Sequence, residues 1–406
     1  PRTRCKACAL SIEGRIEMDP GLDAQQAAVI HRAAELSRDQ FAKRAERFDR
    51  EATFPLENYV DLHKAGLLGL TVPKKYGGIG ADWLTVALTL LEIGKGCAAT
   101  AATFNMHCVI LDFIAQLGTE EQKRRWFTEV IDAGKLFASI TSEPSSSFRH
   151  KFVLSTTFKP VDGGLILNGI KHFGSIGEHA SYHFVSAMME GSTTAKEGQR
   201  SAVVPANSPG VTIERNWDAI GMRGTASDSI KYHDCFVRQE DCLGGIAALA
   251  TIDITGFALG FAAIYLGIGE AAFEYVLDYV KTQSFKLPEP LSHHPQTQQA
   301  IGEMATAIRA ARGLLREAAS VKMKGERAAT VLAVNQSKYF SAEVGSAVTE
   351  RAIRLAGGRG ILRRYPLERW RRDALCGPVM SPANDRCMET AGKILCGLEG
   401  RTLEYV

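Results

Sequence analysis

Three short segments of this sequence combine residue types that suit contact with a flat, polar ligand. Ser142–Pro144 carries a hydroxyl group, and Phe173 places an aromatic ring two positions before the hydroxyl of Ser175. Gly357–Gly360 reads Gly-Gly-Arg-Gly. A hydroxyl donates or accepts a hydrogen bond, an aromatic ring supplies an apolar wall, and glycine lets the backbone approach a ligand closely. Two of the segments also have ordinary explanations: Phe173 as a core strand residue and Ser175 as a turn residue, and Gly357–Gly360 as a helix C-cap.

The elements that must position these segments follow from the hydrophobic pattern. In the first third, apolar residues recur at helical spacing, and Pro55 opens a helix that runs to His63. The middle third is rich in β-branched residues, Ser and Gly, which favours short strands. The last third returns to long helical segments. We expect helices over 24–50, 86–94, 98–117, 251–279, 296–324, 328–355 and 384–395, and strands over 152–159, 164–173, 183–187, 200–205 and 230–237.

This order predicts an α+β multidomain fold. Residues 18–135 form an N-terminal helical domain, residues 136–247 a small β-barrel or sandwich, and residues 248–406 a four-helix bundle. Residues 1–17 are set aside as a linker or tag remnant, because Ile12–Arg15 matches a protease site often placed in linkers. The pair Cys5 and Cys8 lies in that segment, and a single CxxC is weak support for a metal site.

Composition excludes several classes of protein. Apolar residues make up 45% of the 406 positions and charged residues 23%, which is typical of a globular protein. A net charge of +3 gives no reason to expect a nucleic-acid partner. The uncharged stretch between Asp253 and Glu270 is shorter than the roughly 20 residues of a membrane span, so no membrane association is expected. Nine cysteines and no secretion signal favour a reducing, cytoplasmic setting.

The order of elements, together with nine motifs in register, resembles the acyl-CoA dehydrogenase superfamily over residues 50–395. The motifs are Val72-Pro73 with Tyr76–Gly78, Leu91–Gly94, Gly118–Lys123, Ser142–Pro144, Asn168–Phe173, Gly221–Thr225, Gly357–Gly360, Tyr365-Pro366 and Arg372-Asp373. One such motif is weak, but nine at the expected intervals are specific. The resemblance implies a flavoprotein that carries FAD and oxidises a small molecule, in many members an acyl thioester.

The resemblance also assigns cofactor contacts. Ser142 would line the isoalloxazine ring where a Thr is usual, and Phe173 and Ser175 would flank its reactive edge. Gly357 and Gly358 would meet the adenosine diphosphate part of an FAD that is bound mainly by a neighbouring subunit. One subunit alone would then have an incomplete site, so we expect a homotetramer built from dimers, or a dimer.

The sequence departs from the family at the catalytic base. An acyl-CoA dehydrogenase needs a carboxylate to remove the α-proton of its substrate. That Glu usually stands eight residues after the Asp of Arg372-Asp373, where this chain has Ser381. A minority of members place it in the first long bundle helix, near Phe257 here. Ser381 is too weak a base alone, and Asp385, one helical turn further, is the nearby carboxylate we propose instead.

A second departure concerns the FAD pyrophosphate. The family usually has an Arg three residues before Phe285 and a Gly after it, but Thr282 and Lys286 stand there. Ser147–Arg149 also replaces the usual Gly-Ser-Asp. Arg354 and Arg149 are the candidates to supply the missing positive charge. Weaker FAD anchoring suits an enzyme that takes FMN or reduced flavin as a co-substrate.

Three functions therefore compete. The first is oxidation of an acyl thioester, carried on CoA or a carrier protein, with a displaced base. The second is a monooxygenase that uses reduced flavin from a flavin reductase together with O2, since such branches of the superfamily lack the Glu. The third is a non-catalytic partner subunit of a heteromeric dehydrogenase, against which the retained Phe173 and Ser175 count. A binding or scaffold protein unrelated to flavin remains as the alternative without catalytic activity. The histidines nearest the flavin segments are expected to be bystanders: His107, His172, His179 and His183.

Overall fold

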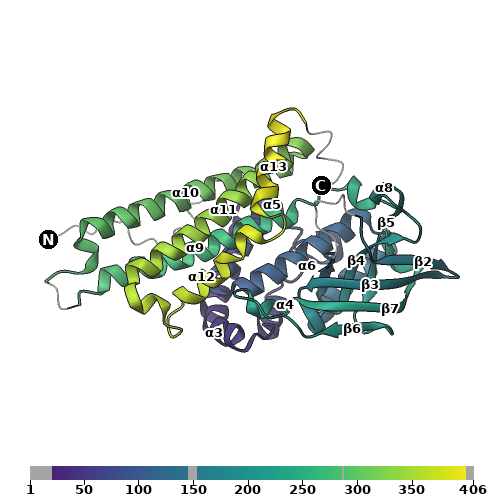
Figure 1. Cartoon of the computed structure of the whole chain (residues 1–406), viewed down its shortest axis with the longest axis horizontal. Coiled ribbons are helices and arrows are strands. Elements are labelled where there is room, and N and C mark those ends of the chain that lie inside the picture. The colour runs from purple at the N-terminus through teal and green to yellow at the C-terminus, as the bar shows by residue number, and fades with distance from the viewer. Residues whose placement is uncertain (1–20, 145–152, 286–287, 399–406) are drawn as a thin grey trace.

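The computed structural model describes residues 21–144, 153–285 and 288–398. The sheet lies at one end of the molecule, the far ends of the long bundle helices lie at the other, and N-terminal helices lie between them (Figure 1). This is the predicted order of a helical domain, a β domain and a helical bundle, so the predicted fold class is confirmed.

The N-terminal part is helical because its apolar residues recur on one face of each segment. The expected helix over 24–50 is two helices joined by a π-helical turn at Ser37–Phe41. Thr119 and Asp23 each cap a helix with a reciprocal side-chain and backbone pair, which satisfies otherwise unpaired N–H groups. The helices are α2 (Ala24–Leu36), α3 (Ala42–Glu51), α4 (Leu56–Lys64), α5 (Trp83–Gly96), α6 (Ala98–Leu117) and α7 (Glu120–Ala133).

The middle part forms one connected eight-stranded sheet in the order β6-β7-β3-β2-β4-β5-β8, with β1 paired to β4. The two neighbours β1 and β2 run parallel to β4, and the other pairs are antiparallel. All five predicted strands are present; the first begins at Thr157, and Phe152 lies outside the described residues. The strands are β1 (Phe137–Ile140), β2 (Thr157–Val161), β3 (Gly164–Gly174), β4 (Tyr182–Met189), β5 (Gln199–Pro205), β6 (Val211–Glu214), β7 (Asp228–Arg238) and β8 (Cys242–Leu243).

The C-terminal part is the predicted bundle, in which α9, α10 and α11 pack together and α12 and α13 pack on α11. Helix α9 has no charged residue before Glu270, and 89% of its most apolar window is buried inside the protein. By length and composition α6 and α9 are the two described helices that could cross a membrane, but their burial identifies them as core helices. The helices are α9 (Gly256–Thr282), α10 (Pro295–Lys324), α11 (Arg327–Ala356), α12 (Leu367–Leu375) and α13 (Asn384–Leu395).

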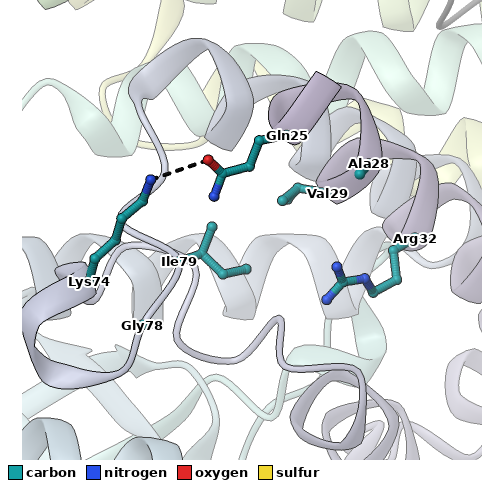
Figure 2. Close-up of a pocket in the computed structure, with 7 residues that line it drawn as sticks. All are labelled: Gln25, Ala28, Val29, Arg32, Lys74, Gly78 and Ile79. Atoms are coloured by element: carbon teal, nitrogen blue, oxygen red, sulfur yellow. Dashed lines mark hydrogen bonds between the residues drawn. The ribbon is translucent and has the colours of Figure 1, made fainter. Parts of the chain in front are cut away.

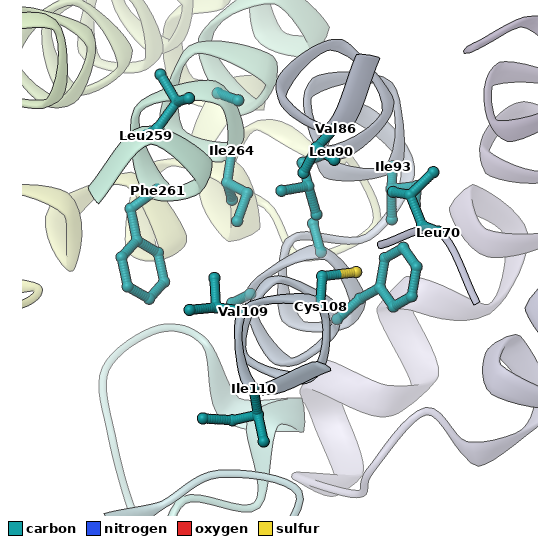
Figure 3. Close-up of a cluster of buried hydrophobic side chains, with 14 of the residues drawn as sticks. Leu70, Val86, Leu90, Ile93, Cys108, Val109, Ile110, Leu259, Phe261 and Ile264 are labelled. Carbon is teal, nitrogen blue, oxygen red and sulfur yellow. The ribbon is translucent and has the colours of Figure 1, made fainter. Parts of the chain in front are cut away.

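Glycine lets α9 contact its neighbours backbone to backbone. A Cβ atom at Gly267 would lie 2.4 Å from the carbonyl oxygen of Leu91 in α5, and one at Gly345 of α11 would lie 2.3 Å from that of Tyr265. Neither position accepts a side chain without moving a helix. Apolar side chains of α5, α6 and α9 fill the space beside these contacts (Figure 3). The N-terminal domain and the bundle therefore share one core.

Arg372 and Asp373 tie all three parts together. The guanidinium of Arg372 donates to both carboxylate oxygens of Asp49 in α3, at 2.8 and 2.6 Å, to Glu368 and to the carbonyl of Ile220. The carboxylate of the buried Asp373 accepts the backbone N–H of Met222 at 2.6 Å. Asp49 belongs to the N-terminal domain and residues 220–222 to the β domain, so one dipeptide of α12 fixes both against the bundle.

The Arg372 contacts lead to a stability prediction. Arg372→Ala leaves Asp49 and Glu368 without their shared partner in a poorly hydrated site, so we expect the free energy of unfolding to fall by about 3 kcal/mol. Arg50→Ala, next to Asp49 in α3, removes an exposed ion pair with Glu46. This control should change the free energy of unfolding by less than about 1 kcal/mol. Urea unfolding of both variants measures the difference. Equal, small losses would show that the tie contributes little.

Asp373 gives a second prediction, on pH. Burial raises the pKa of its carboxyl to about 6, although the Met222 N–H opposes the shift. Between pH 4 and 6 the folded protein then holds a proton that the unfolded chain has released. Stability contributed by the protonated group is lost as pH rises through 6, on the order of 3 kcal/mol. Asp373→Asn keeps the acceptor oxygen but cannot titrate. Its stability relative to wild type should therefore be greater at pH 7 than at pH 4.5 in urea unfolding, and a pH-independent difference would contradict this.

Candidate functional site

Phe173 stands at the end of β3 in an unusual state for a large apolar residue. Its ring is 62% exposed, and its backbone adopts the left-handed conformation with φ of 55°. Ile176, three residues later, has φ of 78°. Such backbones cost on the order of 1–3 kcal/mol each for non-glycine residues and gather at ligand sites. The segment is therefore held in a strained shape that presents an aromatic ring.

The hydroxyl of Ser175 points inward. Its Oγ lies 2.8 Å from Oγ of Ser227, which lies 2.7 Å from Oγ of Thr225, and Thr225 donates to the carbonyl of Met222 at 2.9 Å. This chain of hydroxyl groups fixes the turn after Phe173 to the loop before β7. Ser175 is buried, so the turn presents its backbone and the Phe173 ring rather than the Ser175 side chain.

Ser142 joins the same cluster through the backbone. The N–H of His172 donates to the carbonyl of Ser142 at 2.9 Å, which sets Ser142 beside the end of β3. The Ser142 side chain is half-buried. The structure therefore brings together the three residues predicted for the flavin ring, Ser142, Phe173 and Ser175. Arg149, predicted as a candidate for the missing charge at the FAD pyrophosphate, lies outside the described residues, as does Lys286.

A buried ion pair supports this cluster, and the sequence reasoning missed it. Nζ of Lys171 lies 2.7 Å from Oε1 of Glu143, with both side chains fully buried. Lys171 also donates to the carbonyls of Ser186 and Thr141, while Glu143 accepts the backbone N–H groups of Ser155 and Thr156. The available signal was two opposite charges close to proposed contact residues: Glu143 directly after Ser142, and Lys171 two positions before Phe173.

The environment of this pair explains its pKa shifts. Burial lowers the pKa of Lys171 to about 8, although Glu143 opposes the shift. Burial also acts to raise the pKa of Glu143, but the Lys171 charge and the N–H donors outweigh it and leave that pKa below its usual value. Both groups are therefore charged near neutral pH. Their five hydrogen bonds lock the segment after β1 to β3, to β4 and to the residues just before β2.

The second predicted group lies elsewhere. Arg354, Gly357 and Gly358 follow one another at the end of α11, the end of the bundle that lies far from the sheet (Figure 1). Gly357 has φ of 61°, and a Cβ at either glycine would meet nothing within 4 Å. Arg354 is exposed and pairs with Glu350 at 2.6 Å. Within one chain the structure thus separates this group from the Phe173 cluster.

Arg359 closes the glycine turn over the loop after α9. Its Nη1 donates to Oε1 of Gln283 at 3.2 Å, and its guanidinium lies 4.7 Å from the centre of the Phe285 ring. Phe285 is about half exposed. Sequence reasoning expected Thr282 and Phe285 to shape the pyrophosphate site, and the structure puts that loop beside the glycine turn. The retained glycine turn and the altered loop after α9 therefore form one surface.

A pocket of about 320 Å³ opens on the N-terminal domain, away from these groups (Figure 2). Nζ of Lys74 donates to Oε1 of Gln25 at 3.2 Å across one side of it. It holds none of the predicted site residues, so it is not the candidate site. The lining residues are Gln25, Ala28, Val29, Arg32, Lys74, Gly78 and Ile79.

Comparisons with known proteins agree with this fold. Three family models match in order: the acyl-CoA dehydrogenase N-terminal domain over residues 23–133, the middle domain over 138–235 and the C-terminal domain over 259–378. Together they span most of the chain. The chain belongs to the acyl-CoA dehydrogenase superfamily. Its members are flavin-dependent oxidoreductases, so the predicted enzyme class and flavin cofactor are confirmed.

Relatives within the superfamily differ in reaction. The chain is 29% identical to acryloyl-CoA reductase (NADH) of Anaerotignum propionicum, over 88% of this chain and 91% of that protein. It is 28% identical to dibenzothiophene monooxygenase of Rhodococcus erythropolis, over 83% and 86%. Among solved structures, butyryl-CoA dehydrogenase of Megasphaera elsdenii superimposes with a TM-score of 0.87 at 27% identity, covering 93% of this chain and all of that one.

In this acyl-CoA dehydrogenase superfamily member, neither of the two positions where the sequence resemblance predicts a base carries a carboxylate. Ser381 is half-buried in the loop between α12 and α13, and Phe257 packs its ring edge-on against Phe113 at 5.8 Å. Asp385 is exposed in the first turn of α13, where its Oδ1 accepts the backbone N–H of Arg386. Whether Asp385 acts as a base stays a prediction.

Lys338 holds the loop that carries Ser381. Its buried Nζ donates to the carbonyl of Gly377 and to Oδ1 of Asn384, each at 2.9 Å. Asn384 in turn donates to Glu343 at 2.7 Å. Burial lowers the pKa of Lys338 to about 8. The two ends of the Ser381 loop are thereby pinned to α11.

The buried histidines are structural. Burial lowers the pKa of His107 to about 4, and its ring lies between the carbonyl of Leu68 and the N–H of Phe137. Burial lowers the pKa of His183 likewise to about 4, beside the hydroxyl of Tyr232. A neutral ring with backbone partners is poorly placed for proton transfer to a substrate.

The Lys171–Glu143 pair leads to a prediction. Lys171→Met leaves a buried carboxylate without its cation, which should lower the free energy of unfolding by about 3–5 kcal/mol. Lys171→Met combined with Glu143→Gln removes the uncompensated charge and should recover a large part of that loss. Urea unfolding of the two variants and of Glu143→Gln alone completes the cycle. Additive losses would show that the pair does not act as a unit.

Proposed function

We propose that this protein is a flavin-dependent monooxygenase that acts on a small molecule without a carboxylate base. The observation that carries the proposal is the chemistry of Ser381 and Phe257, the residues at the two positions where the family places its Glu. A seryl hydroxyl and an aromatic ring do not remove an α-proton unaided. Oxygenation has no such requirement, and a relative of similar identity is a monooxygenase.

The residues present fit a flavin. The exposed, strained Phe173 offers an apolar wall, and Ser142 beside it offers a hydroxyl and backbone groups. When bound in reduced form, a flavin supplies two electrons, so that one atom of O2 enters the substrate and the other leaves as water. Phe173 would exclude water from the flavin ring and Ser142 would orient its polar edge, while the hydrogen-bonded hydroxyl chain that starts at Ser175 keeps the segment in shape.

The surface formed by the glycine turn and the loop after α9 lacks the Arg that the family usually has three residues before Phe285, so the adenosine diphosphate part of FAD would be held weakly there. Thr282 provides no charge, and Arg354 shares its own with Glu350. Such a site suits FMN, or a reduced flavin that exchanges with a flavin reductase. Because Gly357 and Gly358 lie far from Phe173 in one chain, they would serve the flavin of a neighbouring subunit in a dimer or homotetramer.

A second candidate is oxidation of an acyl thioester, carried on CoA or a carrier protein. Similarity over nine-tenths of the acryloyl-CoA reductase chain supports it. Asp385 would then be the base, after a movement that brings it from the surface to the substrate. The third candidate, a non-catalytic partner subunit, is disfavoured by the retained Phe173 cluster.

The base positions lead to a prediction that separates these functions. Wild-type protein, mixed anaerobically with straight-chain acyl-CoA substrates, should bleach its flavin slowly. Ser381→Glu should speed bleaching by about 10²–10⁴-fold if the acyl chain lies where the family places it.

The oxygenation assay supplies the protein with reduced FMN, O2 and dibenzothiophene as a probe, and it should give a product heavier by one oxygen atom. Fast bleaching by the wild type, abolished by Asp385→Asn, would overturn the monooxygenase proposal.

Arg354 gives a prediction on cofactor choice. A charge-assisted contact with pyrophosphate is worth about 1.5–3 kcal/mol, so Arg354→Ala should weaken FAD binding roughly ten- to a hundredfold. FMN lacks the pyrophosphate and should bind with unchanged affinity. Isothermal titration with both flavins makes the comparison, and Arg50→Ala, another exposed Arg that pairs with a Glu four residues earlier in its helix, serves as the matched control. Equal weakening of FAD and FMN would place Arg354 away from the pyrophosphate.

A further inference from the structure

Trp217 lies beside Phe173 although 44 positions separate them in the sequence. The two ring centres are 6.1 Å apart, and the ring planes stand at 81°. The Phe173 ring is largely exposed, so the pair forms a right-angled aromatic corner that opens to solvent. The ring of His172 lies 6.4 Å from Phe173 on the same segment.

The position of the Trp217 ring is well defined, because hydrogen bonds hold both its backbone N–H and its indole N–H. Its backbone N–H donates to Oδ1 of the buried Asp228 at 2.9 Å, and its indole Nε1 donates to the carbonyl of Met222 at 3.2 Å. Asn216 exchanges hydrogen bonds with Ser229, whose Oγ lies 2.7 Å from Nδ1 of His172. Met222 is itself held by Asp373. The loop therefore cannot release the indole without breaking contacts to β7 and α12.

An exposed aromatic pair that hydrogen bonds hold in a fixed position is typical of a ligand-binding surface. A planar group that stacks on one ring meets the other ring edge-on, and both contacts are favourable for aromatic systems. The Phe173 ring and the Ser142 and Ser175 segments converge at the same place, where the proposed function puts the flavin. The strained backbone of Phe173 adds to the case, since strain of this kind gathers at ligand sites.

We propose that Trp217 is a flavin-contact residue, which with Phe173 encloses one edge of the isoalloxazine ring and shields it from water. This inference rests on the proposed flavin site at Phe173 and adds a residue from the loop between β6 and β7. The loop is thus part of the binding site, and the tie through Asp373 and Met222 keeps it in place.

The test uses binding and fluorescence rather than turnover. The full chain is titrated with FMN and FAD while tryptophan emission is recorded, for wild type, Trp217→Phe, Trp217→Leu and the control Trp83→Phe. Trp217→Phe should lose much of the flavin-induced quenching, because the indole nearest the flavin is gone, whereas Trp83→Phe should keep it. Trp217→Leu should bind flavin roughly tenfold more weakly, and Trp217→Phe less than threefold. Circular dichroism confirms that each variant is folded.

The outcomes separate this inference from the proposed function. If wild type binds flavin and Trp217→Leu binds it equally well, Trp217 is not a contact and the inference fails alone. Quenching retained in full by Trp217→Phe overturns it in the same way. If wild type binds neither FMN nor FAD, the proposed function fails and this inference fails with it. Weaker binding together with lost quenching supports both.

Discussion

The fork between Arg372 and Asp49, with the neighbouring bond from Met222 to Asp373, is the constraint on which the rest depends. Asp49 belongs to the N-terminal domain, Met222 to the β domain, and Arg372 and Asp373 to the bundle. These contacts therefore fix the three parts of the fold relative to one another. The guanidinium is suited to the task because its planar donors serve two carboxylates and a carbonyl together. Through Met222 the same contact reaches the loop of Trp217 and the hydroxyl chain of Ser175. The candidate site is thus anchored to the bundle, although its side chains belong to the β domain.

A second constraint acts within the β domain. The Lys171–Glu143 pair is buried in full, where a lone charge would be very unfavourable, so both partners and all their hydrogen bonds must form together. This makes the end of β3 rigid on its inner side. Phe173 on the outer side can then keep a strained backbone and an exposed ring, which a looser strand would relax. The buried Lys171–Glu143 pair and the exposed Phe173 ring thus lie on opposite sides of the same segment of β3.

The scaffold is conventional while the reacting groups are not. The three domains of the family are retained, whereas Ser381, Phe257 and Thr282 stand where the sequence resemblance predicts other residues. Fold therefore does not decide the reaction, and the chemistry of a few side chains does. A site with an aromatic corner and no carboxylate base suits electron transfer to oxygen better than proton abstraction.

The sequence by itself determined the order of domains, nearly all the long helices, five strands and which residues are candidates for flavin contact, because hydrophobic period and short motifs are local properties. It did not reveal β1, β6 and β8, which are short and depend on pairing partners. Nor could it show that the hydroxyl of Ser175 turns inward, that Lys171 pairs with Glu143, or that Trp217 meets Phe173. Those facts are decided by strand register and by packing between residues far apart in the chain. A sequence pattern names the residue types, but only the tertiary structure sets which of them lie within a few ångströms of each other.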